Sequence, residues 1–253
     1  MNNFKDKVVL ITGGSGGIGS TAAKMFVERG AKVMLVDIDE EALKKTVEEI
    51  GADKAAYVAA DVSDERQVKN YVDKTIEKFN TIDVFFNNAG VEGKVIPLDE
   101  YPLDEFNKVI DINVKGVYYG LRQVFPKMKE KGGSIIMTSS VAGMMGTPNV
   151  LPYVTSKHAV VGMMKTAAQE GAPHKIRVNT INPSPVDNRM MRSLEDGFAP
   201  GEAESAKKNF EQSIPLGRYA TNDEVAKLVL FLAGEDSEFI TGTINPIDGG
   251  MTA

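Results

Sequence analysis

The stretch Val8-Val9-Leu10-Ile11-Thr12-Gly13-Gly14-Ser15-Gly16-Gly17-Ile18-Gly19 carries the strongest fold signal in this chain. Its first five residues are mostly apolar and β-branched and predict a buried strand, and the glycines after them predict a turn into a helix. A helix that begins there offers free N–H groups and the positive end of its dipole to a phosphate. The stretch therefore predicts a strand, a phosphate-binding loop and a helix.

Two glycine patterns fit the loop. Gly14, Gly16 and Gly19 match G-x-G-x-x-G, whereas Gly13, Gly17 and Gly19 match G-x-x-x-G-x-G. In either pattern small residues let the backbone approach a pyrophosphate closely. A lone glycine pattern is also compatible with a plain turn, and the strand and helix around it favour the phosphate loop.

The rest of the chain continues this alternation of strands and helices. Further strands are expected at 32–36, 55–59, 82–86, 134–138, 175–181 and 242–247, and helices at 17–29, 40–50, 64–79, 103–109, 114–131, 154–169 and 221–232. Ser63 is the expected N-cap of the third helix, and Thr221 and Glu224 have the spacing of a capping box. The alternation predicts an α/β fold with a parallel sheet and helices on both faces. Residues 183–215 are the exception and predict a long irregular insertion.

Composition narrows the class of protein. The 253 residues fit one large α/β domain as well as two small ones, and the net charge of −6 disfavours a nucleic-acid surface. The chain has no Cys and only two His, so neither a disulfide nor a thiolate or histidine metal site is expected, which suits the reducing cytoplasm. The polar residues 1–7 predict no signal peptide, and the chain lacks the roughly 18 apolar residues of a membrane span.

Asp37 ends the second predicted strand, 18 residues after Gly19. A carboxylate at this place can accept both hydroxyls of an adenosine ribose and repels a 2′-phosphate. Taken alone it could equally be a solvated loop acid. Gly16 and Ile38 occupy two positions where a protein that binds a 2′-phosphate would carry a cation, and neither is basic. This part of the sequence favours NAD over NADP.

Polar residues also follow the third and fourth strands, at the edge where open α/β sheets bind ligands. After the third come Asp61 and Val62, and after the fourth come Asn87-Asn88-Ala89-Gly90. Asp61 is expected either to bind the adenine amine or to cap the next helix. Asn88 is a candidate for the adenosine ribose, and Asn87 for tying neighbouring strands together. A tight turn that ends at Gly90 is the structural alternative.

Tyr153 and Lys157 are four residues apart, and Ser140 lies thirteen residues before Tyr153. Positions i and i+4 share one face of a helix, so the phenol and the ammonium would point into the same space. A nearby cation favours the phenolate of a tyrosine, whose ordinary pKa is about 10. A serine hydroxyl beside the phenol could hold a carbonyl or alcohol oxygen. Such a pair alone is more often an exposed surface pair.

These motifs, in this order, resemble those of the short-chain dehydrogenase/reductase family over nearly the whole chain. The matching residues are Thr12–Gly19, Asn87–Gly90, Asn113, Ser140, Tyr153-x-x-x-Lys157, Asn182-Pro183, Phe239-Ile240-Thr241-Gly242 and Asp248-Gly249-Gly250. The resemblance implies a single NAD(P)-binding Rossmann-fold domain over residues 1–253, doubly wound around a seven-stranded parallel sheet, with the substrate loop inserted at about 183–215. It also implies a homotetramer.

The resemblance further implies a role for each matching residue. Tyr153 would be the general acid/base, and Lys157 would hold the nicotinamide ribose and lower the pKa of the tyrosine. Ser140 rather than Ser139 would orient the substrate, and Asn113 would support a water relay to solvent. The hydride itself would pass between the nicotinamide and the substrate carbon.

The same resemblance assigns a cofactor surface. Its expected residues are Gly13, Ser15, Gly16, Gly17, Ile18, Gly19, Asp37, Ile38, Asp61, Val62, Asn88, Ala89, Gly90, Tyr153, Lys157, Pro183, Val186 and Asn188. Two positions depart from the family pattern: Ser184 stands where Gly is frequent, and Asn188 stands where Thr is frequent. An amide can donate and accept hydrogen bonds, so contact with the nicotinamide carboxamide is still expected at Asn188.

The substrate side is less defined. Candidate pocket residues are Val91, Glu92, Val141, Met144, Met145, Asn149, Met190, Met191 and Phe198. The methionines would form a pliable apolar wall or fill a core or an interface, and Glu92 and Asn149 are candidates for binding hydroxyls of a diol or a sugar.

The expected function is an NAD(H)-dependent oxidoreductase that acts on a secondary alcohol or ketone. An NADPH-dependent 3-oxoacyl-thioester reductase that receives its substrate from an acyl carrier protein is the alternative, although the acidic chain lacks a basic residue at position 16. A non-catalytic NAD-sensing or scaffolding protein is the alternative from another class, and it would be expected to lose Tyr153 or Lys157. No metal, nucleic acid or membrane is an expected partner.

Overall fold

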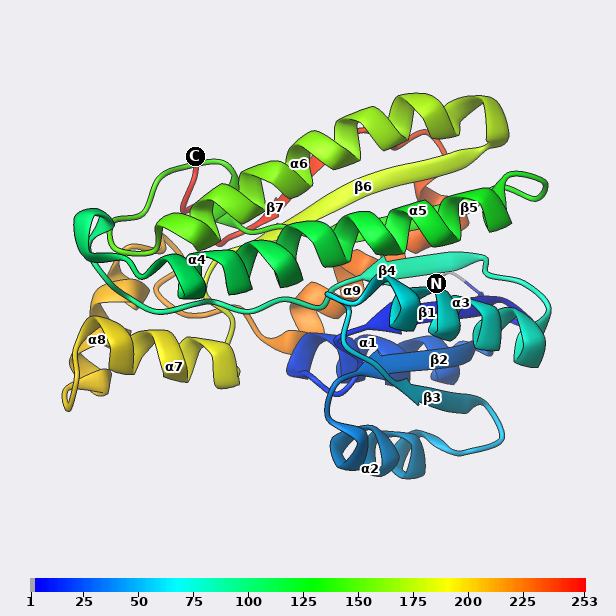
Figure 1. Ribbon diagram of the computed structural model, residues 1–253, viewed down its shortest axis with the longest axis horizontal. Coiled ribbons are helices and arrows are strands. Elements are labelled where there is room, and N and C mark those ends of the chain that lie inside the picture. Colours follow the sequence, from blue (N-terminus) through cyan, green and yellow to red (C-terminus); the bar gives the residue numbers. More distant parts are fainter. Residues whose placement is uncertain (1–2) are drawn as a thin grey trace.

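The computed structural model describes residues 3–253, so the first two residues of the polar start lie outside the described part. Seven strands form one sheet in the order β3-β2-β1-β4-β5-β6-β7, and every pairing is parallel (Figure 1). The strands are β1 Val8–Thr12, β2 Lys32–Asp37, β3 Ala55–Ala59, β4 Val84–Asn87, β5 Gly133–Thr138, β6 Ile176–Pro183 and β7 Ile244–Ile247. The predicted single-domain, seven-stranded parallel sheet is confirmed.

The chain reverses its direction of winding at β1. Val9 of this strand pairs with Val33 of β2 on one side and with Val84 of β4 on the other. The connections after β1 and β4 therefore leave the sheet in opposite directions and open a crevice at the carboxyl ends of these two strands. Open α/β sheets bind their ligands at such a switch point.

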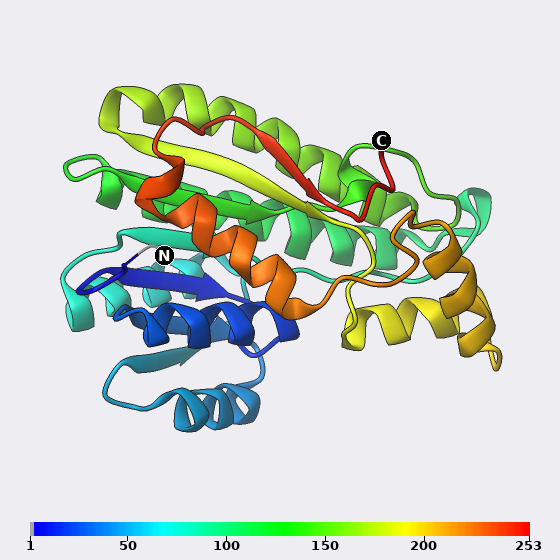
Figure 2. The ribbon, with the colours of Figure 1, turned by 180° about the vertical axis from the view of Figure 1, so that it is seen from behind.

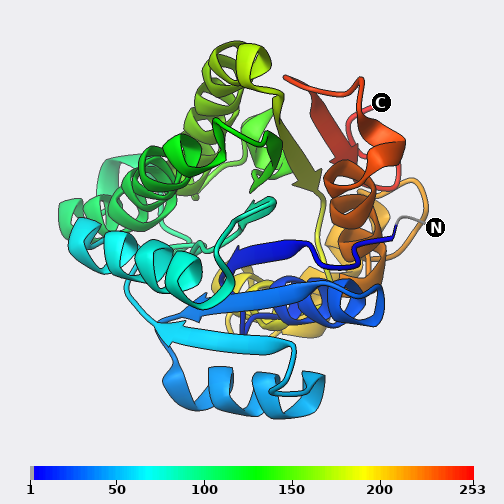
Figure 3. The same ribbon diagram turned by 90° about the vertical axis from the view of Figure 1, so that its right-hand side faces the viewer.

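Helices cover both faces of the sheet (Figure 3). One face carries α1 Gly17–Glu28, α2 Glu40–Ile50 and α9 Asn222–Ala233, and the other carries α3 Glu65–Phe79, α4 Leu103–Ile110, α5 Val117–Met128 and α6 Leu151–Gly171. Short helical turns lie at Leu98–Glu100, Val141–Gly143, Ala172–His174 and Glu235–Ser237. No helix among residues 3–253 is long and apolar enough to cross a membrane.

Alternate side chains of each strand supply two cores. Val9 and Ile11 point into the core beneath α1 and α9, whereas Leu10 points into the core beneath α3, α5 and α6. All three residues are fully buried. Because strands covered on both faces bury every side chain, the central strand is a continuous apolar run. Each such side chain contributes roughly 1.5–3 kcal/mol by leaving water.

The sixth helix begins earlier than predicted. It was expected from residue 154, but α6 starts at Leu151, with Pro152 in the first turn, where a missing N–H has no cost. Tyr153 therefore belongs to the helix, one turn before Lys157. This difference matters because the two side chains are positioned by the same rigid element.

The insertion at 183–215 is not irregular, and this prediction was wrong. It contains α7 Arg189–Phe198 and α8 Ala203–Gln212, which pack against each other beside the main body (Figure 2). The rings of Phe198 and Phe210 meet edge to face at 5.4 Å. Both helices have only ten residues, which is too short for their periodicity to stand out from the surrounding loop residues.

The two helices predicted at 103–109 and 114–131 are continuous. A π-helical stretch, Asp111–Gly116, joins α4 to α5. Widened turns of this kind occur frequently at functional sites, and this one contains Asn113. The predicted capping box of the last long helix is present: Thr221 Oγ1 accepts a hydrogen bond from the N–H of Glu224, whose carboxylate accepts from the N–H of Thr221.

Candidate active site and cofactor site

The residues expected to bind ligands converge on one edge of the sheet. The loops after β1, β2, β3 and β4, the end of β5 and the end of β6 all lie at the carboxyl ends of the strands, toward which the arrows point in Figure 2. The pair α7 and α8 lies on the same side of the molecule.

The packing of the glycine-rich loop requires glycines from both patterns. A Cβ added to Gly19 would lie 2.1 Å from the carbonyl oxygen of Gly13, and one added to Gly17 would lie 2.8 Å from the Asn222 side chain. Gly13 has a φ of +66°, which side-chain-bearing residues rarely adopt. Gly16 has room, because its nearest neighbour would be 3.4 Å away. A Cβ added to Gly14 would lie 2.9 Å from Leu35 Cβ, so packing requires glycine at 13, 14, 17 and 19 and leaves room only at 16.

The N-terminus of α1 has no side-chain cap. Gly16 is its N-cap residue, and its first turn contains no acidic residue. By contrast, Asp39 caps α2 and Thr221 caps α9. The first N–H groups of α1 thus remain available, and no carboxylate within its own first turn offsets the positive end of its dipole. This is the environment that an anionic phosphate requires.

Asp37 lies at the end of β2 and is fastened to the glycine-rich loop. Its Oδ2 accepts from the N–H of Ser15 at 3.1 Å and from the Ser15 hydroxyl at 2.6 Å, and its Oδ1 accepts from the N–H of Ile38 at 2.8 Å. Ionised carboxylate oxygens accept more than one bond each, so Asp37 can still accept further donors. Ile38 beside it is 72% exposed.

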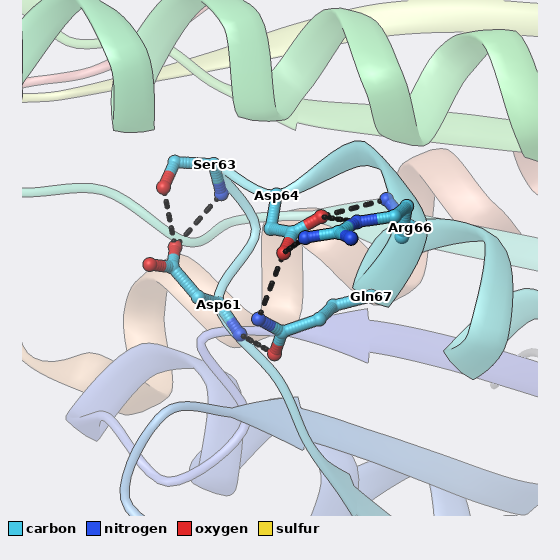
Figure 4. A network of polar contacts seen from close by, with 5 residues as sticks. All are labelled: Asp61, Ser63, Asp64, Arg66 and Gln67. Atoms are coloured by element: carbon cyan, nitrogen blue, oxygen red, sulfur yellow. Dashed lines mark hydrogen bonds and ion pairs between the residues drawn. The ribbon is translucent and has the colours of Figure 1, made fainter.

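The loop after β3 differs from its prediction (Figure 4). Asp64, rather than Ser63 or Asp61, caps α3 by accepting from the N–H of Arg66 at 2.9 Å. A hydrogen bond from the Arg66 side chain is the main reason that the pKa of Asp64 is lowered to about 2, and the N–H of Arg66 lowers it further. Asp61 instead holds Ser63, through its hydroxyl at 2.7 Å and its N–H at 2.8 Å, and its own N–H donates to Gln67.

One consequence concerns Asp61 as a ligand residue. Both of the bonds that it accepts from Ser63 use Oδ1, and no donor among residues 3–253 reaches Oδ2. The oxygen Oδ2 is therefore the one atom of this side chain that could accept from an adenine amine, and that contact stays a prediction.

Both asparagines after β4 tie the structure together. Asn87 donates to the carbonyl of Val117 in α5 and accepts from the Thr12 hydroxyl, in line with its expected role. Asn88 donates to the carbonyl of Thr12 and accepts from the Thr138 hydroxyl, so it joins β1, β4 and β5. Because the side chain of Asn88 is committed to these bonds, its predicted contact with a ribose would come from the backbone.

Ser140, Tyr153 and Lys157 lie together. The Ser140 side chain forms a hydrogen bond with the Tyr153 hydroxyl, and the Lys157 Nζ lies 5.4 Å from the centre of the Tyr153 ring. Lys157 is 4% exposed, and its ammonium donates to the carbonyl of Thr138 at 3.0 Å. The hydroxyl of Ser139 donates to the backbone carbonyl of Lys157, so this serine fastens α6 and does not face Tyr153.

Burial dominates the protonation of this group. It raises the pKa of Tyr153 to about 12, a shift that the Ser140 hydrogen bond opposes and the charge of Glu92 reinforces. Burial also lowers the pKa of Lys157 to about 8. Without cofactor and substrate, the tyrosine pKa therefore moves away from neutrality rather than toward it, contrary to the expected effect of the lysine. Desolvation disfavours the phenolate of Tyr153 and the ammonium of Lys157. This effect on the two pKa values is larger than the effect of each group on the other.

Asn113 is fully buried, and all polar atoms of its side chain have partners. Its Oδ1 accepts from the N–H of Val91, and its Nδ2 donates to the carbonyl of Val91 and to the Ser156 hydroxyl. A Cβ added to Gly90 would lie 3.1 Å from Asn113 Oδ1 and 3.4 Å from Lys157 Nζ, so these groups border one space. Since the side chain is saturated, a water relay at Asn113 would use its backbone carbonyl.

The segment after β6 supplies backbone groups. Val186 bridges to Ala220 through its two neighbours: Asp187 donates to the carbonyl of Ala220, and Ala220 donates to the carbonyl of Pro185. In a parallel bridge of this kind the N–H and C=O of the residue between the two bonded neighbours, here Val186, point away from the paired strand. Among residues 3–253 neither group of Val186 has a partner. Both are therefore oriented to bind a polar group of a ligand.

Asn188 has a structural role that the sequence interpretation did not include. Its Oδ1 accepts from the N–H groups of Met190 and Met191 and so caps α7. Only the Nδ2 of Asn188 remains for the expected contact with a carboxamide.

The candidate substrate residues fall into two groups. Met191 is buried with Ile214 and Tyr219, so for this methionine the filler interpretation is correct, and Phe198 packs against Phe210. Met144 and Met145 are 37% and 40% exposed, and Asn149 is also exposed, in a left-handed conformation. They remain candidates for a surface that a substrate or another chain covers.

The structure contains one feature that the sequence did not indicate. A cavity of about 470 Å³ separates the insertion from α9 and lies away from Tyr153; its lining residues are Asp187, Lys207, Glu211, Arg218, Tyr219, Thr221, Glu224 and Lys227. Behind it Glu195 is buried and paired with Arg192 at 3.1 Å. The spacing of three residues between Arg192 and Glu195 on an amphipathic helix is the sequence signal from which this ion pair could have been predicted. Within residues 3–253 no three acidic or histidine side chains could jointly hold a metal ion.

Comparison with known proteins agrees with this geometry. The family model described as "Enoyl-(Acyl carrier protein) reductase" matches residues 13–252. Levodione reductase of Leifsonia aquatica is 41% identical, over 99% of this chain and 96% of its own length. Cyclohexanol dehydrogenase of Acinetobacter sp. (strain SE19) is 35% identical, over 100% of this chain and 97% of its own length. The crystal structure of an NAD⁺-bound xylitol dehydrogenase superimposes with a TM-score of 0.93 at 35% identity, covering 98% of this chain and 99% of that one.

These matches span essentially the whole chain. The protein belongs to the short-chain dehydrogenase/reductase family, as its motifs indicated.

Proposed function

We propose that this protein is an NAD(H)-dependent oxidoreductase that transfers a hydride between nicotinamide and a secondary alcohol or the corresponding ketone. The observation that carries the proposal is the group formed by Ser140, Tyr153 and Lys157 at the carboxyl edge of the sheet. Its relatives support the same reaction class, since those described above are named as a reductase and dehydrogenases of alcohols or ketones.

The described residues fit a nicotinamide dinucleotide. The uncapped N-terminus of α1 and the close-packed glycines of its loop would hold the pyrophosphate. Lys157 would hold the nicotinamide ribose, and the free backbone groups of Val186 would meet the carboxamide. When bound, the nicotinamide ring supplies the hydride acceptor or donor.

We assign the preference for NAD to Asp37. Its carboxylate is held in place by Ser15 and Ile38, so it would repel a 2′-phosphate and still accept ribose hydroxyls. Neither Gly16 nor Ile38 offers a cation to such a phosphate.

Tyr153 would move the proton. In the direction of ketone reduction it donates its proton to the substrate oxygen, and in alcohol oxidation it takes the hydroxyl proton. Its raised pKa suits the donor role in the free enzyme. Lys157 has no carboxylate partner within the described residues, so its positive charge is available to stabilise the phenolate that remains. The Ser140 hydroxyl holds the same substrate oxygen.

Two other functions are less well supported. A 3-oxoacyl-thioester reductase shares this chemistry, and the description of the matching family model names a reductase of acyl-carrier substrates. The acidic chain and the uncharged residue 16 do not favour it. A non-catalytic NAD sensor would not need the complete set of Asn113, Ser140, Tyr153 and Lys157, which this protein assembles in one place.

The insertion and the assembly belong to the same proposal. The helices α7 and α8 would cover the substrate as a lid. Exposed apolar residues such as Tyr118, Phe231 and Phe239 lie on α5, on α9 and next to the last strand, and they are suited to contacts between copies. A homotetramer located in the cytoplasm stays a prediction.

The test is NADH formation or consumption, followed by absorbance, with a panel of secondary alcohols and ketones and with both cofactors. Tyr153→Phe should lower kcat about 100- to 10,000-fold, because one proton transfer loses its acid/base. The binding of NADH should persist, since the phenol hydroxyl is not needed to hold the dinucleotide. Activity near that of the wild type would remove Tyr153 from its role. NADH binding without turnover of any substrate would support the sensor instead.

A further inference from the structure

Glu92 is a buried carboxylate without a partner. It lies in the loop after β4 and is 7% exposed. The other two buried acids of residues 3–253 each have a partner: Glu195 pairs with Arg192, and Asp248 accepts from Gly250 and Thr252. No hydrogen bond or ion pair within the same residues reaches the carboxylate of Glu92, although a buried carboxylate ordinarily has donors around it.

The loop on either side of Glu92 contacts the catalytic helix. A Cβ on Gly90 would lie 3.4 Å from Lys157 Nζ, and a Cβ on Gly93 would lie 4.0 Å from Pro152, the residue before Tyr153. The charge of Glu92 is close enough to act on Tyr153 and to raise the pKa of its phenol. Glu92 therefore borders the space in front of Tyr153.

The insertion approaches the same loop from the opposite side. A Cβ on Gly197 of α7 would lie 2.7 Å from the side chain of Val95, three residues after Glu92. A substrate held at Tyr153 would thus lie between α6 and α7, with Glu92 beside it.

The carboxylate oxygens are not sealed in the interior. Fully enclosed polar atoms without partners occur at other residues, including Glu195 and Tyr219, but Glu92 is not among them. Its oxygens therefore keep some contact with an opening, and water can satisfy them in the free protein. A ligand that displaces this water leaves the carboxylate uncompensated unless the ligand itself brings a donor.

We propose that the Glu92 carboxylate accepts a hydrogen bond from a second hydroxyl group of the substrate, so that diols and hydroxyketones are preferred over monofunctional alcohols. This inference rests on the proposed function and specifies its substrate class. Glu92 acts as a specificity residue and takes no part in the proton transfer. A substrate with a carboxylate or a phosphate at the position of the second hydroxyl is repelled.

The experiment compares cyclohexanol with the 1,2-, 1,3- and 1,4-cyclohexanediols. The wild type, Glu92→Gln and Glu92→Leu are assayed for kcat/KM with each compound. The wild type should favour at least one diol over cyclohexanol, and in Glu92→Leu this ratio should fall about 10- to 100-fold, as expected for a lost hydrogen bond to a charged group. Glu92→Gln keeps a hydrogen-bond acceptor without the charge, so its ratio of kcat/KM for the diol to that for cyclohexanol should lie between those of the wild type and Glu92→Leu.

The ratio of kcat/KM for a diol to that for cyclohexanol separates a specificity role of Glu92 from a structural role. Any effect of Glu92 on the fold or on the pKa of Tyr153 acts on all four compounds and cancels in the ratio. Glu100→Gln is the matched control, because it removes an exposed carboxylate from the same loop and should leave the ratio as it is. Thermal unfolding and NADH fluorescence show whether each variant is folded, and if Glu92→Leu is not, the isosteric Glu92→Gln decides.

Two results overturn the inference while the proposed function stands. One is a wild type that oxidises cyclohexanol but prefers no diol, and the other is a diol preference that survives both substitutions at Glu92. The absence of turnover with every alcohol and ketone and with either cofactor contradicts the proposed function, and the inference with it.

Discussion

The cofactor region and the insertion that faces it are built in different ways. Around β1, the site is made by backbone geometry: glycines that tolerate no Cβ, a helix without a cap, and the amide of Asn88 that ties three strands together. The insertion has its own small core, in which Met191, Ile214 and Tyr219 are the buried members.

The difference follows from what each region has to bind. A dinucleotide is always the same molecule, so the backbone that holds it can be rigid and can be packed to fixed distances. If α7 and α8 form the proposed lid, they have to open for each substrate, and elements that move are drawn from the less stable part of a fold. A core of only three buried side chains has low local stability, because it removes little apolar surface from water.

The first way to break this comparison is to add one methyl group to the rigid region. Gly19→Ala would place a Cβ 2.1 Å from the carbonyl oxygen of Gly13, and backbone cannot give way as a side chain does. The free energy of unfolding should fall by about 1–3 kcal/mol, as for other overpacked sites. Urea denaturation measures this directly.

The matched control is Gly16→Ala in the same loop. Its Cβ would meet its nearest neighbour at 3.4 Å, and the backbone there has an ordinary φ of −71°. Its unfolding free energy should stay within about 0.5 kcal/mol of the wild type. Equal destabilisation by both substitutions would show that close packing is not what requires glycine at position 19.

A smaller effect is expected from Asp37, which is the part of the cofactor region that works through a side chain. Asp37→Ser should lower the ratio of kcat/KM for NAD to that for NADP by about 10- to 100-fold, since a charged acceptor is lost and a 2′-phosphate is no longer repelled. Asp39→Ser removes a charge two residues away and keeps a side chain that can cap α2. If both substitutions changed the ratio equally, general charge and not ribose recognition would set the cofactor preference.

Much of the rigid region could be predicted from the sequence. The alternation of strands and helices, the loop at Gly13–Gly19 and the pairing of Tyr153 with Lys157 depend on local patterns: apolar runs, turns and a spacing of four residues. Such patterns indicate the local backbone conformation, and the strands, turns and helices of this fold follow from that conformation. Which of these glycines packing requires could not be predicted, because it depends on contacts with Leu35, Asn88 and Asn222, which are distant in sequence.

The insertion and the protonation of the site could not be predicted in the same way. Two helices of ten residues form because they pack on each other through Phe198 and Phe210, and this tertiary contact leaves only a weak periodic signal. The pKa of Tyr153 was expected to fall because Lys157 is nearby. Its rise to about 12 comes from burial, which is a property of the assembled site and not of the spacing of four residues.

Hydrogen exchange measures the cofactor region and the insertion in one experiment. Of the three predictions, after those for Gly19 and Asp37, it should show the smallest change. In the free protein, the amides of α7 and α8 should exchange faster than those of α1, because their core is small. Saturating NADH should slow exchange within residues 183–215 about tenfold, since one or two new hydrogen bonds to Val186 and to Asn188 Nδ2 are each worth about 1 kcal/mol. The control ligand is ADP-ribose, which occupies the site at α1 but lacks the nicotinamide ring. It should protect the amides of α1 and leave those of α7 as they are in the free protein. If ADP-ribose protected both regions equally, the lid would respond to the pyrophosphate, and Val186 would not be the contact that couples it to the reacting ring.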